Sequence, residues 1–92
     1  MEKYRFTLTK TMHYYGCPQA RYDFNIKGSY LDGRLTWWGN QGFDALVITN
    51  NHNGCNGYIW SMHKLMNEIY GDGKEIRKGF GLREGESMEI VL

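Results

Sequence analysis

The chain has 92 residues, of which 41% are hydrophobic and 15% aromatic, and its formal net charge is +1. This length fits one small domain with a single core, and the hydrophobic share is too high for an intrinsically disordered chain. The near-zero charge argues against a typical nucleic-acid-binding domain, which carries a clear excess of Lys and Arg.

Two antiparallel strands are predicted at the start of the chain. Apolar and polar residues alternate in 4–15, and again in ARYDFNIKG, after a break at Gly16-Cys17-Pro18. The residues expected on the inward face are Tyr4, Phe6, Leu8, Met12 and Tyr14 in the first strand, and Tyr22, Phe24 and Ile26 in the second.

The next segment predicts a hairpin and a central strand. Asp32-Gly33 is typical of a type I′ turn, in which both central residues need positive φ, and it leads into a strand over 34–38. GNQG (39–42) predicts another turn. FDALVIT (43–49) is continuously apolar, as is typical of a strand in the middle of a sheet.

A helix is predicted from Tyr58, where the spacing of apolar residues changes. We expect Asn56 to cap its start, and Gly71 or Gly73 to end it in the left-handed conformation. Its apolar stripe consists of Tyr58, Ile59, Met62, Leu65, Met66 and Ile69.

The tail predicts a closing hairpin, with strands near 75–83 and 87–92 and a turn at 84–86. The expected order is β-β-β-β-α-β-β. We therefore expect a single α+β domain over 1–92, with an antiparallel sheet of about five to six strands and one helix packed on one face.

The loop NNHNGCNG (50–57) is interpreted as a turn between strand and helix. It lacks the P-loop and dinucleotide-binding patterns, and GCNG (54–57) matches only a bare GxxG, as in the clamp of KH domains, with no basic residue between the glycines. Asn and Gly both tolerate the positive φ that a tight reversal needs.

A zinc-stabilised Cys2His2 module is one alternative. His13 and Cys17 form an H-x3-C pair, and His52 and Cys55 form an H-x2-C pair, so each Cys has a nearby His. The usual C-x2-C knuckle is absent, and on an extended strand positions four apart are separated by about 13 Å. Against this stands the interpretation of both Cys as free thiols in turns or in the core.

KGFGLREG (78–85) resembles the first positions of the RNP1 motif of RNA-recognition motif (RRM) domains, with Leu82 in place of the fifth-position aromatic. LVITNN (46–51) loosely resembles the companion RNP2 strand, with Val47 where the stacking aromatic is expected. Too little chain follows residue 85 for the second helix and last strand of a complete RRM.

The resemblance implies that Phe80 stacks on a base while Lys78 and Arg83 contact phosphates. The competing interpretation is a strand whose Gly79 and Gly81 mark a bulge or close packing. The first alternative function, ahead of the zinc module, is thus a single-stranded nucleic-acid-binding module on the C-terminal hairpin, using Lys74, Arg77, Lys78, Phe80 and Arg83.

Aromatic residues near strand ends lead to the main hypothesis. Adjacent side chains on a strand point to opposite faces, so one of Trp37 and Trp38 is expected in the core and the other outside it. Tyr15 and Tyr30 are placed similarly. Exposed Trp and Tyr are typical anchors of protein interfaces, so the expected partner-binding residues are Trp37, Trp38, Tyr30 and Tyr15.

We therefore expect a non-enzymatic binding protein with a macromolecular partner, most simply a protein. Viruses and mobile elements make inhibitors of this size against host enzymes or defence complexes, an analogy of size and composition only. No Gly-x-Ser-x-Gly motif or cofactor motif is found, so we expect no catalytic residues and no cofactor.

The sequence also predicts where the protein acts and how it could self-associate. No run approaches about 18 apolar residues and the N-terminus lacks the apolar core of a signal peptide, so we expect a cytoplasmic protein with no membrane partner. Homodimerisation is open through the last strand, because Ile90-Val91-Leu92 carries no charge to guard an edge.

Overall fold

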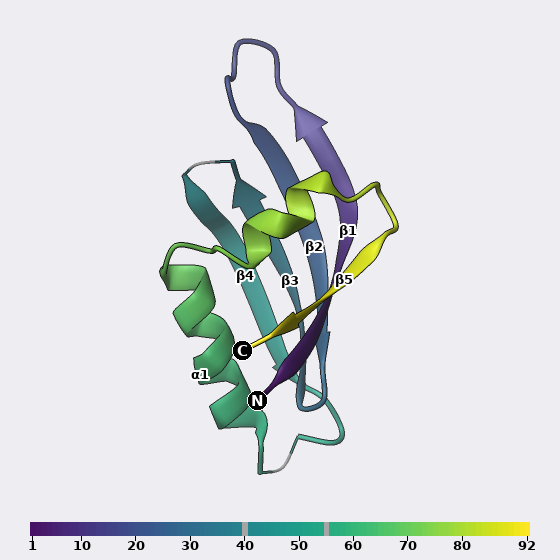
Figure 1. The fold of residues 1–92 in the computed structure, drawn as a ribbon, viewed down its shortest axis with the longest axis vertical. Coiled ribbons are helices and arrows are strands. Elements are labelled where there is room, and N and C mark those ends of the chain that lie inside the picture. The colour runs from purple at the N-terminus through teal and green to yellow at the C-terminus, as the bar shows by residue number, and fades with distance from the viewer. Residues whose placement is uncertain (40, 55) are drawn as a thin grey trace.

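An antiparallel five-stranded sheet with strand order β4-β3-β2-β1-β5 forms the body of the computed structural model, which describes residues 1–39, 41–54 and 56–92 (Figure 1). One α-helix and one 3-10 helix complete the α+β fold that the sequence predicts. In chain order the elements are β1 (Lys3–His13), β2 (Ala20–Gly28), β3 (Leu31–Trp38), β4 (Gly42–Asn50), α1 (Tyr58–Tyr70), η1 (Ile76–Gly81) and β5 (Ser87–Val91).

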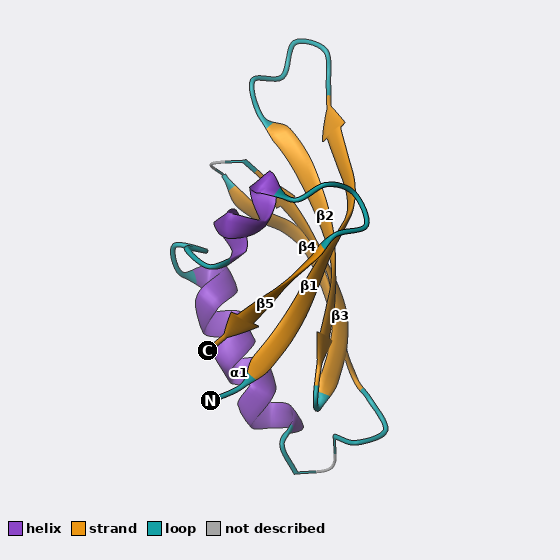
Figure 2. Cartoon of the chain, turned by 45° about the vertical axis from the view of Figure 1, so that its right-hand side comes forward, coloured by secondary structure: helices purple, strands orange, loops and turns teal. Residues whose placement is uncertain are grey.

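Both helices lie on the same face of the sheet, as Figure 2 shows, and the core fills the space between them and the strands. Burying each large apolar side chain of this core contributes about 1.5–3 kcal/mol. We call this side the covered face and the opposite side the open face. The buried core cluster consists of Tyr4, Phe6, Leu8, Phe24, Ile26, Leu31, Leu35, Trp37, Leu65, Ile69, Ile76 and Ile90.

A β-bulge at Thr9 changes which residues of β1 enter the core. The register with β2 shifts between Leu8 and Lys10, so that Leu8 is buried whereas Lys10 is exposed. An extra residue in one strand reverses the alternation that follows it. Met12 and Tyr14, which simple alternation places inside, therefore lie on the open face, and Tyr14 is 39% exposed.

The segment predicted as a central strand is an edge strand. β4 lies at one border of the sheet, and β2 occupies its centre. The apolar run in β4 has a different cause: α1 packs against this strand and partly covers Leu46 and Ile48. Val47 lies on the other face and is 49% exposed.

Asp32 and Gly33 do not form the predicted hairpin turn. Both belong to β3, where they pair with Lys27 and Ile26 of β2, and the chain reverses earlier, at residues 29–30. Gly33 is needed for a close approach between strands instead, since a Cβ there would lie 2.7 Å from the carbonyl oxygen of Val47.

The predicted strand over 75–83 is also wrong, because residues 76–81 form η1. The Glu68 carboxylate of α1 accepts hydrogen bonds from the two backbone N–H groups where the 3-10 turn begins, at 2.8 and 3.3 Å. Gly79 lets η1 lie directly on the sheet, since a Cβ there would lie 2.7 Å from the Phe24 ring. Local capping and close packing therefore outweigh the strand-like pattern.

Helix α1 begins at Tyr58 as predicted, but the residues that flank it behave differently from the expectation. Gly57 occupies the N-cap position without a side-chain hydrogen bond, so Asn56 does not cap the helix. Gly73, with φ +62°, takes the left-handed conformation after the helix, whereas Gly71 does not.

The buried side of α1 is rotated from the predicted stripe. Ser61, Leu65 and Ile69 are buried, while Ile59 is 64% exposed. Ser61 is tolerated inside because its hydroxyl donates a hydrogen bond to the Tyr4 hydroxyl at 3.0 Å. Within the described ranges, neither helix is long and apolar enough to cross a membrane.

Candidate functional site

The open face of the sheet carries an uneven share of the charge. The strand register places six basic residues on this face, namely Lys3, Arg5, Lys10, Arg21, Lys27 and Arg34. It places three acidic residues there, namely Asp23, Asp32 and Glu89. The whole chain has 11 basic and 10 acidic residues, which leaves five basic and seven acidic elsewhere. The net charge of +1 thus divides into +3 on the open face and −2 on the rest of the molecule.

One end of the open face holds an aromatic patch, which we define as Met12, Tyr14, Arg21 and Trp38. The rings of Tyr14 and Trp38 lie 5.5 Å apart between centroids and are tilted by 37°. The Tyr14 hydroxyl donates a hydrogen bond to the Met12 sulfur at 3.4 Å. Tyr15, the next residue in the β1–β2 loop, is fully exposed. The patch is therefore a preformed cluster of large side chains, of which Tyr14 is exposed and the others are half-buried.

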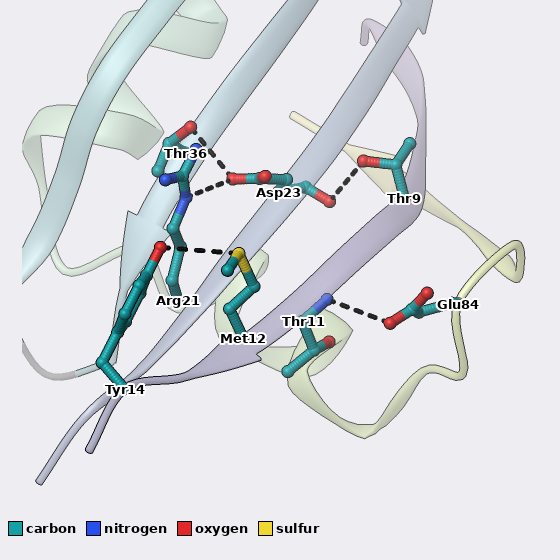
Figure 3. A network of polar contacts seen from close by, with 8 residues as sticks. All are labelled: Thr9, Thr11, Met12, Tyr14, Arg21, Asp23, Thr36 and Glu84. Atoms are coloured by element: carbon teal, nitrogen blue, oxygen red, sulfur yellow. Dashed lines mark hydrogen bonds and ion pairs between the residues drawn. The ribbon is translucent and has the colours of Figure 1, made fainter. Parts of the chain in front are cut away.

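Polar contacts hold the strands beneath this patch (Figure 3). Arg21 donates a hydrogen bond to the Asp23 carboxylate at 3.0 Å, and the same oxygen accepts one from the Thr36 hydroxyl at 3.0 Å. The hydrogen bond to Asp23, with a second one to Tyr14, raises the pKa of Arg21 above its ordinary value. Arg21 is thus held as a fixed cation beside the aromatic rings.

Three adjoining hollows run across the open face next to the patch, and together we call them the groove. Their volumes are about 270, 470 and 270 Å³. Arg5 and Lys27 line both the first and the second hollow, and Asn25 and Arg34 line both the second and the third. The groove is therefore a row of shallow, adjoining hollows, and cationic side chains border each of them.

Asp32, which lines the middle hollow, has an unpartnered carboxylate oxygen. Oδ1 of Asp32 is buried and accepts no hydrogen bond from any residue in the described ranges. Leaving a buried carboxylate oxygen without a donor is unfavourable. Because this oxygen is closed off from solvent, it is not an acceptor that a molecule in the hollow can reach.

The four residues predicted to bind a partner are spread over the molecule. Trp37 is 1% exposed and lies in the core, whereas Trp38 lies on the open face, so the two adjacent side chains divide as the alternation requires. Tyr15 and Trp38 belong to the same end of the sheet. Tyr30 lies at the opposite end, where its ring packs on Gly57.

The residues proposed for nucleic-acid binding do not form a hairpin. The Phe80 ring stacks on Tyr22 with centroids 4.1 Å apart, so one of its faces is occupied. Arg77 donates hydrogen bonds to the carbonyl oxygens of Asp72 and Gly39. The other members of that set are Lys78, which forms an ion pair with Glu75 at 2.8 Å, and Lys74 and Arg83, which are exposed.

The zinc ligands predicted from sequence do not converge within the described residues. His13 ends β1 at the loop that contains Cys17, whereas His52 follows β4 at the other end of the sheet. Cys55 lies outside the described residues. Among those that are described, no group of three His, Cys, Asp or Glu side chains could hold a metal ion.

The loop before α1 forms a turn over residues 51–54. The Asn51 side chain accepts a hydrogen bond from the backbone N–H of Asn53 and donates one to the carbonyl oxygen of Gly28. Gly54 completes the turn by donating its N–H to the carbonyl oxygen of Asn51 at 3.1 Å. The polar groups of Asn51 therefore serve the loop itself.

Sequence reasoning missed most of the open face. Met12 and Tyr14 were expected in the core, and only the bulge at Thr9 places them outside. Trp60 was not considered, although it is 61% exposed on α1, where the Lys64 ammonium lies 5.0 Å from its ring centroid. The alternation of Arg5, Thr7, Asn25 and Lys27 opposite apolar residues was a usable signal for a polar face.

Self-association through the last strand stays a prediction. β5 is an edge strand, as that prediction requires, and Val91 is 40% exposed.

Comparison with family models, curated proteins and solved structures finds no match to this chain. The candidate site therefore rests on the geometry of the open face.

Proposed function

We propose that the protein is a small non-enzymatic binding protein that docks onto a partner protein through the aromatic patch. One observation supports this most: the bulge at Thr9 brings Met12 and Tyr14 outside, next to Trp38 and Arg21. Aromatic residues, Met and Arg are the types enriched in protein interfaces, and Trp, Tyr and Arg dominate their binding energy.

The surroundings of the patch support the same function. Fully exposed Tyr15 extends the contact area at the end of the sheet. The Arg21–Asp23–Thr36 contacts fix the strands below the rings, which lowers the entropy lost on binding. A rigid domain of this kind can block a partner's surface, so the proposal includes the role of an inhibitor of an enzyme or a defence complex, of the kind made by viruses and mobile elements, in the cytoplasm.

The test is partner capture from the cells that produce the protein, comparing Trp38→Ala with Trp60→Ala. Both substitutions remove a Trp side chain that lies outside the core: Trp38 is half-buried on the open face and Trp60 is 61% exposed, and only Trp38 belongs to the patch. We expect Trp38→Ala to weaken capture by about 2 kcal/mol or more, as truncation of an interface anchor does. We expect Trp60→Ala to leave capture unchanged.

The opposite pattern would contradict the proposal. If Trp60→Ala abolishes capture and Trp38→Ala does not, the docking surface is the exposed side of α1. Circular dichroism of both variants shows that the fold is intact, which separates loss of an anchor from loss of structure.

A further inference from the structure

The groove beside the aromatic patch indicates the chemistry of the partner. We propose that the groove receives an acidic, extended segment of the partner protein, and this inference rests on the function proposed above. Carboxylates of that segment lie against Arg5, Lys27 and Arg34.

Charge complementarity is the first argument. Arg5, Lys27 and Arg34 are exposed and border the middle hollow of about 470 Å³. Within the described residues none of the three forms an ion pair, although two of them face an acidic cross-strand neighbour. Cations that the fold does not use for itself attract a negatively charged partner and orient it.

The polar lining of the hollow is the second argument. Thr7, Asn25 and Ser87 lie between the cations and offer hydroxyl and amide groups. The Thr7 and Ser87 hydroxyls already lie 2.7 Å apart across β1 and β5. Such groups suit the backbone and carboxylates of an extended peptide, because each can donate or accept a hydrogen bond.

The carboxylates of the groove distinguish a peptide from a uniform polyanion, and Asp32 is one of them. Asp23 and Glu89 also lie along the groove, and these carboxylates repel a continuous row of phosphates. A protein segment with spaced acidic side chains fits this mixture of charges.

The absence of a stacking platform in the groove also disfavours nucleic acid. Single strands bind sheet surfaces largely by stacking bases on aromatic rings. Among the described residues, the aromatic side chains that line the three hollows are Tyr4 and Phe24, and both are buried in the core. The rings of the aromatic patch lie at the end of the groove and serve as anchors.

The test is an NMR titration of the whole protein with three probes: oligoglutamate, oligoglutamine of the same length, and oligothymidylate of the same charge. We expect oligoglutamate alone to shift the amide signals of Arg5, Asp32 and Arg34 at moderate salt. The triple variant Arg5→Gln, Lys27→Gln, Arg34→Gln should lower its affinity about tenfold.

The matched control is Lys64→Gln, Lys74→Gln, Arg83→Gln, which removes the same charge from positions outside the open face and should bind as the wild type does. Tighter binding of oligothymidylate, or equal weakening in both triple variants, overturns the inference. So does the absence of shifts with oligoglutamate.

Failure of the acidic-segment inference can be told apart from failure of the proposed function. If capture of the partner depends on Trp38 but is unchanged in the open-face triple variant, the aromatic patch is the docking site and the acidic segment is wrong. If no partner is captured through Trp38 while oligoglutamate still binds the groove, the proposed function fails instead.

Discussion

The two faces of the sheet differ in what their side chains are used for, and the neighbouring residues Trp37 and Trp38 show this best. Trp37 is 1% exposed on the covered face and donates a hydrogen bond from its indole N–H to the carbonyl oxygen of Gly39 at 3.0 Å. Trp38 lies on the open face, where its described ring partner is the accessible Tyr14. One Trp belongs to the core, and the other is half-buried at the surface of the sheet.

The same division follows the strands along their length. On the covered face, apolar residues meet α1 and η1 and form the core. On the open face, no helix in the described parts of the chain covers the strands, and cations, hydroxyls and a few aromatic rings meet solvent. The exposure of a large side chain in this sheet therefore depends on the local strand register, and residue type alone does not predict it.

The strongest test of this difference is Trp37→Ala against Trp38→Ala. Emptying the buried site should lower the free energy of unfolding by about 3–5 kcal/mol, because lost burial and the remaining cavity both destabilise. Trp38→Ala should cost less than about 1 kcal/mol, as at other accessible sites. Chemical denaturation followed by circular dichroism measures both; equal losses would show that the open face is not accessible.

Gly73 tests how closely the covered face is packed. It has φ +62°, and a Cβ there would overlap the Trp37 ring. Gly73→Ala should therefore lower the free energy of unfolding by about 2–3 kcal/mol, combining backbone strain with displacement of the ring. Gly16, with φ +78° and open space around it, is the control, and Gly16→Ala should cost only about 1 kcal/mol.

A smaller effect concerns the buried hydroxyl of Tyr4. It donates to the carbonyl oxygen of Ser61 and accepts from the Ser61 hydroxyl. Tyr4→Phe should lower the free energy of unfolding by about 1–2 kcal/mol, since it leaves a buried polar group unpaired. Thermal denaturation of Tyr4→Phe and of Tyr70→Phe compares loss of the hydroxyl at a buried Tyr with the same loss at an exposed one.

The same residue gives a pH dependence. Burial, with a contribution from the charge of Glu2, raises the pKa of Tyr4 above 10.0, although the hydrogen bond with Ser61 opposes this. The neutral form is thus favoured in the folded state. The resulting stability is complete below pH 10.0 and is lost as the pH rises through the folded-state pKa. Denaturation midpoints of wild type should fall more steeply above pH 10.0 than those of Tyr4→Phe; parallel curves would contradict this.

The smallest predicted effect is the coupling within the aromatic patch. A double-mutant cycle with Tyr14→Ala and Trp38→Ala should give a coupling energy of about 0.5–1 kcal/mol, because the rings contact each other at an accessible site. Strictly additive losses of stability would mean that the two rings do not pack together in solution.

The sequence predicted the α+β class, the single α-helix from Tyr58 and most of the first two strands, because these depend on local periodicity. It placed Met12 and Tyr14 inside because the bulge at Thr9 has no distinct sequence signal. It placed 43–49 in the centre of the sheet because α1, packing from far along the chain, accounts for the apolar run.

The wrong prediction of a strand near the C-terminus has a similar origin. The segment 75–83 reads as a strand in isolation, but Glu68 caps it as a 3-10 helix and Phe24 packs against Gly79. The candidate site was only partly predictable for the same reason. Trp38 and Tyr15 could be nominated from their positions, whereas the groove forms from all five strands, whose register only the structure gives.

The central claim is that the partner docks on the open face at the aromatic patch. Amide hydrogen exchange of the protein, alone and in the complex isolated from the cells that produce it, tests this most directly. We predict that partner binding slows exchange in residues 10–23 and 34–38, with no change in α1. Slower exchange confined to α1 would contradict the account and would place the partner on the exposed side of that helix.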